Sequence, residues 1–222
     1  MSRHRGNPYA GPDPRTIEAK KMGYPARSIF KLEEINKKTQ LLKKGMRVVD
    51  LGAAPGSWSL YASQQVGPAG KVLAIDLQAI TQGFSPNVKV VQGDAFDLGS
   101  ETLAQFAPYD VILSDMAPKT TGVKTRDQAL SYELFERALD VAQTFGKAGA
   151  AAFVVKIFMG PDFDQAIAKA KAVFKKTRVI RPEGVRPNSK EVFLVGQEMK
   201  VGGYQLTVPP QDAPPNDPSA KA

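Results

Sequence analysis

Short apolar runs alternate with amphipathic stretches along most of the chain from residue 46 onward. Seven runs rich in Val, Ile, Leu and Phe have the length of β-strands: 46–51, 71–76, 88–94, 109–115, 150–158, 177–182 and 191–196. Helical stretches fill most of the gaps, among them 57–65, 127–145 and 162–175. Strands that alternate with helices predict an α/β fold with a mostly parallel sheet covered by helices on both faces. The last two runs are separated by a short Pro/Gly/Asn loop, which predicts an antiparallel hairpin at the end of the sheet.

The two ends of the chain differ in composition from this alternating region. Residues 1–25 are rich in Gly, Pro and basic side chains and predict a flexible basic arm, whereas residues 26–39 carry apolar positions at helical spacing. Residues 208–222 are Pro-rich, which predicts a disordered tail. The sequence therefore predicts one folded domain over residues 26–207 with a short appendage at each end.

A lysine lies inside the most apolar of the predicted strands. Nine of the ten residues in Ala150–Met159 are apolar, and the tenth is Lys156. A buried ammonium group is costly unless it is paired, so this position indicates either a functional site or a structural exception. The alternative is an edge strand from which Lys156 extends into water.

Composition excludes several classes of chemistry. The chain has no cysteine and one histidine, His4, so a Ser-His-Asp triad, a thiolate nucleophile and a Cys/His metal site are all disfavoured. No apolar run approaches the ~20 residues of a membrane span, and no apolar segment follows the basic N-terminus as in a secretory signal. These features predict a cytosolic protein.

The positive charge is concentrated near the N-terminus. Residues 1–47 hold twelve Lys and Arg and four acids, a net charge of 12 − 4 = +8, which equals the formal charge of the whole chain. A concentrated basic segment predicts a polyanionic partner, and the alternative is a segment that only improves solubility.

Ionisable residues recur where the predicted strands end. The first four strands end at or near Asp50, Asp76, Asp94 and Asp115, and the fifth carries Lys156 near its end. In an open α/β sheet, ligands bind beyond the carboxyl ends of the strands. The sequence therefore predicts a binding site at this edge.

The loop after the first strand, Gly52-Ala-Ala-Pro-Gly56, brings backbone N–H groups close to a ligand without the G-x-G-x-x-G spacing of a dinucleotide site. Asp76, twenty residues after Gly56, suits a ribose diol. Carboxylates repel a pyrophosphate but suit a cationic nucleoside such as S-adenosyl-L-methionine. A nicotinamide-dependent dehydrogenase remains as an alternative, although the third glycine is missing.

Several motifs together resemble the FtsJ-type 2′-O-ribose methyltransferases of large-subunit ribosomal RNA, over roughly residues 15–198. They are Arg27-Ser-Ile-Phe-Lys31-Leu, Asp50-Leu-Gly-Ala-Ala-Pro-Gly-Ser-Trp58, Asp115-Met-Ala-Pro118, Val155-Lys156-Ile-Phe158 and Ser189-Lys-Glu191-Val-Phe193. The chain departs from the family pattern at Phe30, Ser57, Phe193 and in Lys119–Gly122, where an Asn-containing turn is expected. The resemblance implies a Rossmann-like class I methyltransferase fold with a seven-stranded sheet and makes residues 26–207 the catalytic domain.

The resemblance also implies roles for individual residues. The implied catalytic tetrad is Lys31, Asp115, Lys156 and Glu191. Lys156 would be the general base for the ribose hydroxyl, which requires its neutral form; Asp115 would orient its amine, and Glu191 would hold Lys31 as a second cation nearby. The implied S-adenosyl-L-methionine site consists of Gly56 and Trp58 at the methionine end, Asp76 at the ribose hydroxyls, Asp94 at the adenine amine, Phe96 against the adenine ring and Asp115 beside the methyl group.

By the same resemblance, the substrate would be a uridine in the A-loop of 23S rRNA within the 50S ribosomal subunit. The enzyme would act as a cytoplasmic monomer, without a metal ion. Basic side chains near the N-terminus would contact flanking phosphates: Arg3, Arg5, Arg15, Lys20, Lys21, Lys37 and Lys38. Transfer RNA or an mRNA cap remains as an alternative target, and a catalytically silent RNA-binding module as an alternative class.

Overall fold

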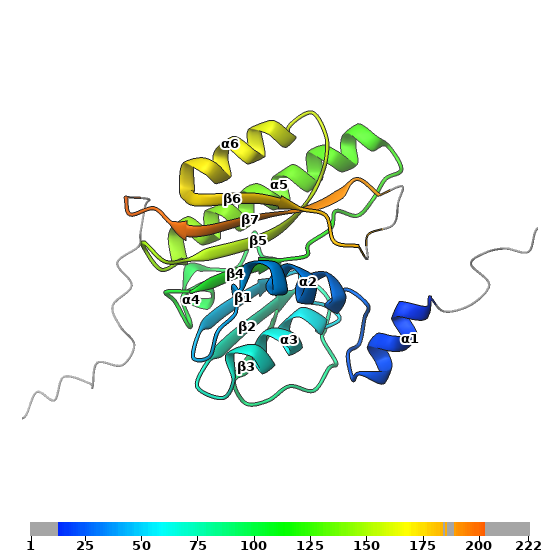
Figure 1. Ribbon diagram of the computed structural model, residues 1–222, viewed down its shortest axis with the longest axis vertical. Helices are drawn as coiled ribbons and strands as arrows, with labels where there is room; N and C mark the ends of the chain where they lie inside the picture. Colours follow the sequence, from blue (N-terminus) through cyan, green and yellow to red (C-terminus); the bar gives the residue numbers. More distant parts are fainter. Residues whose placement is uncertain (1–12, 184, 186–188, 203–222) are drawn as a thin grey trace, which may run out of the picture.

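The computed structural model describes residues 13–183, 185 and 189–202. Seven strands form one sheet in the order β3-β2-β1-β4-β5-β7-β6 (Figure 1). The strands are β1 (Arg47–Leu51), β2 (Lys71–Asp76), β3 (Val88–Gln92), β4 (Val111–Ser114), β5 (Ala152–Phe158), β6 (Phe174–Ile180) and β7 (Glu191–Met199). Strands β1 to β5 are parallel to one another, and β7 runs antiparallel to both β5 and β6. The predicted α/β class and the antiparallel hairpin are therefore confirmed.

Helices cover both faces of the sheet, as predicted. They are α1 (Pro14–Lys21), α2 (Ile29–Thr39), α3 (Ser57–Val66), α4 (Ser100–Leu103), α5 (Lys124–Phe145) and α6 (Phe163–Val173). Helices α2 and α3 pack on one face, and α5 and α6 pack on the other (Figure 1). No helix in the described ranges is long and apolar enough to cross a membrane.

Successive side chains along β5 point alternately into the cores on the two faces of the sheet. On β5, Phe153, Val155 and Ile157 belong to the core beneath α5 and α6, while Ala152 and Val154 belong to the core beneath α2 and α3. Because successive side chains point to opposite faces, Lys156 lies on the α2 side. Strand β5 lies between β4 and β7, so the edge-strand interpretation of Lys156 is wrong.

Strand β6 begins earlier than predicted, and α6 ends earlier. The predicted helix reached residue 175, but the chain becomes extended at Phe174. The ring of Phe174 is almost fully buried and stacks on Phe153 with a centroid distance of 4.5 Å. Burial of this ring in the core therefore outweighs the helical pattern of the surrounding lysines and alanines.

The N-terminal segment also differs from the prediction. Residues 14–21, interpreted as part of a flexible arm, form helix α1. Asp13 caps the helix by accepting from Arg15 N at 2.9 Å and forms an ion pair with Arg27, while Ala19 is fully buried. Residues 1–12 and the predicted tail at 208–222 lie outside the described residues.

Candidate active site

The loop after β1 requires glycine at its first position. Gly52 has a φ of +74°, and a Cβ atom there would lie 2.5 Å from Cγ and 2.9 Å from Cα of Met116. The N–H groups of Gly52 and Ala53 donate to the carbonyl of Ile75 at 2.9 and 3.0 Å. The absence of a side chain therefore lets this loop approach the turn after β4 while the end of β2 holds it in place.

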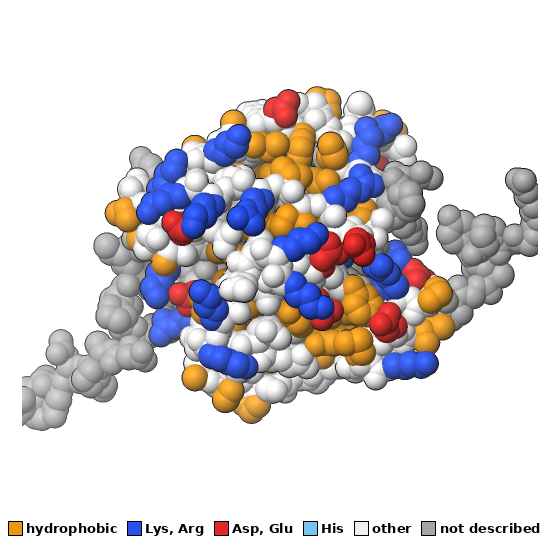
Figure 2. Space-filling view, viewed as in Figure 1, with side chains coloured by type: hydrophobic (Ala, Val, Ile, Leu, Met, Phe, Trp, Pro, Cys, Tyr) orange, Lys and Arg blue, Asp and Glu red, His pale blue; other side chains and the backbone are white. Residues whose placement is uncertain are grey.

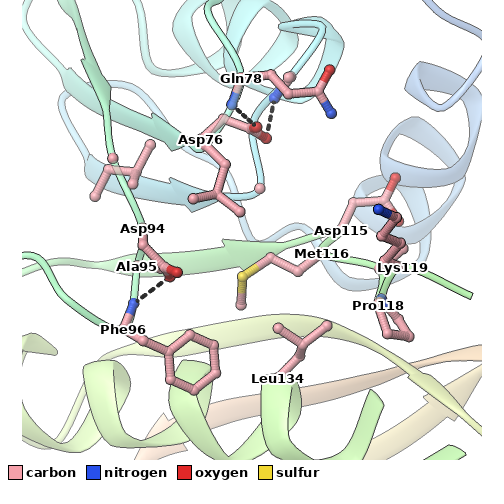
Figure 3. A pocket seen from close by; sticks show the side chains of 16 residues that line it. Asp76, Gln78, Asp94, Ala95, Phe96, Asp115, Met116, Pro118, Lys119 and Leu134 are labelled. Carbon is pink, nitrogen blue, oxygen red and sulfur yellow. Dashed lines mark hydrogen bonds between the residues drawn. The ribbon is translucent and has the colours of Figure 1, made fainter. Parts of the chain in front are cut away.

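A cavity of about 420 Å³ opens between the loops that follow β1, β2, β3 and β4 (Figure 3). Three carboxylates line it: Asp76, Asp94 and Asp115. Its apolar lining includes Ile75, Phe96, Met116 and Leu134. The cavity thus combines apolar walls with several acids, which suits a cationic ligand with a flat ring.

Backbone N–H groups fix two of the three acids. Asp76 accepts from Ala54 N through Oδ2 and from Gln78 N through Oδ1, both at 2.8 Å, and Asp94 Oδ1 accepts from Phe96 N at 2.9 Å (Figure 3). Each carboxylate still has lone pairs for a ligand, because an ionised carboxylate can accept about four hydrogen bonds. Asp76 and Asp94 therefore line the same cavity, as predicted.

The buried lysine forms an ion pair with the aspartate that follows β4. Lys156 Nζ lies 2.9 Å from Asp115 Oδ1 and also donates to the backbone carbonyl of Asp115. The exposed fractions of the two side chains are 7% and 17%. The pair explains how an apolar strand tolerates this ammonium group, and it places Lys156 directly beside the cavity that Asp115 lines.

A second ion pair lies on the same face of the sheet. Lys31 Nζ on α2 lies 2.6 Å from Glu191 Oε1 at the start of β7, and the two side chains are 15% and 14% exposed. This is the pair that the family resemblance implied. Phe193 separates the two ion pairs, because it lies opposite Lys156 in the β5–β7 register and its ring centroid is 5.7 Å from Lys31 Nζ. The four residues of the implied tetrad therefore form two ion pairs on one face of the sheet.

Asp50 is a further acid at this edge and is completely buried. Its Oδ2 accepts from Ser59 Oγ at 2.6 Å, whereas Oδ1 has no hydrogen-bond partner among the described residues. Burial raises the pKa of Asp50 to about 7; the hydrogen bond from Ser59 opposes this shift, and the charges of Asp115 and Asp76 add to it. Sequence reasoning placed this acid at the edge but gave no sign of its unpaired oxygen.

Gly56 and Trp58 do not line the cavity. Trp58 is 2% exposed, and its Nε1 donates to the carbonyl of Ser28 at 2.9 Å, just before α2. Gly56 faces Gln82 and Phe84, which a Cβ atom would approach at 3.1 and 3.0 Å. The structure therefore places Trp58 where it supports the helix that carries Lys31, and its predicted contact with the cofactor stays a prediction.

A second cavity, of about 600 Å³, adjoins the first and shares four lining residues with it: Phe96, Pro118, Lys119 and Leu134. The Lys119–Thr121 stretch of the turn in which the chain departs from the family pattern lines this cavity, together with Arg126 and Leu130 of α5. Neither Leu130 nor Leu134 of α5 could be assigned to the site from the sequence, because both lie far from any motif.

Comparison with known proteins shows the relationships of the chain. Residues 24–199 match the model of the FtsJ-like methyltransferase family. A protein of Sorangium cellulosum named ribosomal RNA large subunit methyltransferase E is 56% identical over 203 residues, covering 91% of this chain and 95% of the relative. A protein of the same name from Desulfatibacillum aliphaticivorans is 46% identical over 196 residues, covering 88% and 94%.

Solved structures agree with this fold. A Plasmodium falciparum protein named as a ribosomal RNA methyltransferase superposes with a TM-score of 0.69 at 26% identity, covering 82% of this chain and all of the other. Human methyltransferase-like protein 13, solved with S-adenosylhomocysteine (SAH), superposes with a TM-score of 0.55 at 20% identity, covering 78% and 83%, and shows likeness of fold alone.

Proposed function

Because the chain belongs to the FtsJ-like methyltransferase family, we propose that it transfers a methyl group from S-adenosyl-L-methionine to ribosomal RNA of the large subunit. More narrowly, the proposed acceptor is the 2′-oxygen of a uridine ribose in the A-loop of 23S rRNA within the 50S subunit. The observation that carries this proposal is the two largely buried Lys–acid ion pairs on one face of the sheet, one of them beside an acid-lined cavity.

The residues of the cavity fit the proposed cofactor. Asp76 and Asp94 offer fixed carboxylate oxygens for a ribose diol and an exocyclic amine, and Phe96, which is 48% exposed, offers a ring for an adenine. When bound, S-adenosyl-L-methionine supplies a methyl group on a positively charged sulfur.

The chain's own residues would prepare the ribose hydroxyl. In the proposed step, Lys156 Nζ accepts the proton of the 2′-OH, and Asp115 orients that nitrogen through its carboxylate and its carbonyl. Lys31, held by Glu191, supplies a positive charge close to the attacking oxygen, where negative charge develops. The two ion pairs hold these side chains in place, so that much of the proposed rate enhancement comes from positioning.

The test is transfer of labelled methyl from S-adenosyl-L-methionine to 50S subunits from cells that lack their A-loop methyltransferase, followed by mapping of the modified nucleotide. We expect label at the 2′-oxygen of an A-loop uridine. We expect Lys156→Ala to lower turnover about 10²- to 10⁴-fold, the usual contribution of a general base, with an unchanged dissociation constant for the cofactor.

The matched control is Lys156→Arg, which keeps a cation for Asp115 but cannot act as a neutral base. Near-normal turnover in either variant would contradict the assignment of the base. If transfer RNA is labelled and 50S subunits are not, the proposed reaction is supported, but the substrate is transfer RNA instead of 23S rRNA.

The proposal includes a cytoplasmic monomer that needs no metal ion and whose basic N-terminal residues contact RNA. The structure modifies one part of this picture, because Lys37 and Lys38 form ion pairs with Glu33 and Glu34 at 3.0 and 2.6 Å. Phosphate contacts by these two lysines would have to compete with the acids one turn earlier on α2.

A further inference from the structure

The side chains of Lys124, at the start of α5, and Lys190, just before β7, contact each other at the strand-end edge. Loss of surrounding water, the charge of Lys124 and direct contact with its side chain, in that order, lower the pKa of Lys190. Both side chains are exposed. In the described part of the chain, neither lysine takes part in an ion pair. Like charges therefore meet without an acid between them.

The backbone brings these two residues together. Lys190, just before β7, accepts from Met159 N through its carbonyl at 2.9 Å. Lys124 is the first residue of α5, and Gln128, one turn later, donates through its side chain to the carbonyl of Met159. Met159 is thus bonded both to the first turn of α5 and to the residue that precedes β7. This packing brings Lys124 close to Lys190.

The lysine pair lies next to the proposed catalytic residues but on the other face of the sheet. Lys190 directly precedes Glu191, which holds Lys31 on the α2 side. Alternation along the strand turns Lys190 toward the α5 side, where Lys124 meets it. The pair is therefore one residue along the chain from the tetrad.

The nearest acids in sequence are already engaged. Asp127 Oδ1 accepts from the N–H and the hydroxyl of Thr121, at 2.7 and 2.9 Å, and Glu191 is paired with Lys31. Among the residues that the structure describes, neither carboxylate forms an ion pair with Lys124 or Lys190, and both lysines are exposed to solvent.

We propose that Lys124 and Lys190 together bind one backbone phosphate of the RNA, next to the nucleotide that is methylated. The proposal rests on the proposed function, because the RNA strand that places its ribose at the tetrad must pass this edge. A single phosphate between the two ammonium groups would remove their mutual repulsion, and ammonium groups bind phosphate oxygens through charge-assisted hydrogen bonds.

The test compares Lys124→Gln, Lys190→Gln and the double variant with the wild type. The dissociation constant for 50S subunits is measured by filter binding over a range of KCl concentrations at fixed Mg²⁺. We expect the double variant to bind about tenfold more weakly. The slope of the logarithm of the binding constant against the logarithm of the salt concentration (the salt slope) should decrease in magnitude by ~0.7 to 0.9, the value for one phosphate. Each single variant should give most of this loss, since the two lysines share one anion. Cofactor affinity should not change.

The matched control is Lys71→Gln with Lys89→Gln, two exposed lysines on β2 and β3 that remove the same charge elsewhere. If the Lys124→Gln, Lys190→Gln double variant has the same dissociation constant and salt slope as this control, the proposal is overturned. The proposal is also overturned if the changes in salt slope of the two single variants add up to the value for two phosphates, because the lysines would then bind separate phosphates. Binding loss as predicted, in an enzyme that fails to label 50S subunits, would support the phosphate site and reject the proposed reaction.

Discussion

The carboxyl-end edge of the sheet divides into an acidic half and a basic half. The acidic half follows β1, β2 and β3, where carboxylates surround a cavity with apolar walls. The basic half lies around the end of β5 and the start of β7, where lysines are paired with single acids or with each other. Asp115, after the central strand β4, belongs to both, because it lines the cavity and holds Lys156.

This separation matches the opposite charges of the two proposed substrates. A cationic sulfonium compound is attracted to the carboxylates, whereas a polyanionic RNA strand is attracted to lysines and repelled by the acids. Lys and Arg side chains are also spread over the face shown in Figure 2, with acids between them. Changes in one half should therefore affect one substrate and leave the other unaffected.

The largest effect on binding is expected in the acidic half. Asp76→Asn removes the charge and one of the two acceptor oxygens, and the remaining oxygen can still accept from Ala54 N of the loop after β1. Loss of a hydrogen bond to a charged group should weaken cofactor binding roughly 10- to 100-fold, measured by calorimetry. Affinity for 50S subunits should stay the same, as in the exposed control Glu101→Gln; equal losses for both substrates would contradict the separation.

The next effect concerns stability rather than binding. The pKa of Asp50 in the folded protein is raised to about 7, so the contribution of this group is complete below its ordinary pKa and is lost as pH rises through about 7. In the Asp50→Asn variant, the unfolding free energy should therefore decrease less steeply between pH 4 and 7 than in the wild type, by up to about 1.4 kcal/mol per pH unit. Urea denaturation of the ligand-free protein at several pH values measures this. An unchanged slope would mean that Asp50 is ionised throughout.

The smallest effect is expected from the N-terminus. Deleting residues 1–12 removes Arg3 and Arg5 but keeps Asp13, which caps α1 and pairs with Arg27. If both arginines contact phosphates, the salt slope for 50S binding should fall by up to ~1.4 with little change in turnover. Deletion of residues 208–222 is the control. A slope that does not change would show that these arginines do not contact the RNA.

Residues that belong to a strand end were predictable, because two simple rules place them. Parallel strands end at one edge, which brought Asp76, Asp94 and Asp115 together, and an antiparallel last strand returns Glu191 to that edge. The resemblance supplied Lys31 as the partner of Glu191, which neither strand pattern nor charge could have identified.

Contacts that depend on how helices pack on the sheet could not be predicted. The indole of Trp58 reaches Ser28 rather than the cavity, and Leu134 enters the cavity from the middle of α5. Helix α1 was missed because its short, polar sequence has a weak apolar face, and burial of Ala19 with the cap at Asp13 stabilises it. The meeting of Lys124 and Lys190 depends on the packing at Met159 in the same way.

The contacts of Ser57 and Trp58 have a mechanical consequence. Ser57 Oγ accepts from the N–H of Ala26 and donates to its carbonyl, at 2.8 and 3.0 Å, and Trp58 bonds to Ser28. These three bonds tie the start of α3, which directly follows the glycine-containing loop, to the segment leading into α2. The loop after β1 and the helix that carries Lys31 are therefore joined mechanically by hydrogen bonds that involve none of the carboxylates of either proposed substrate site.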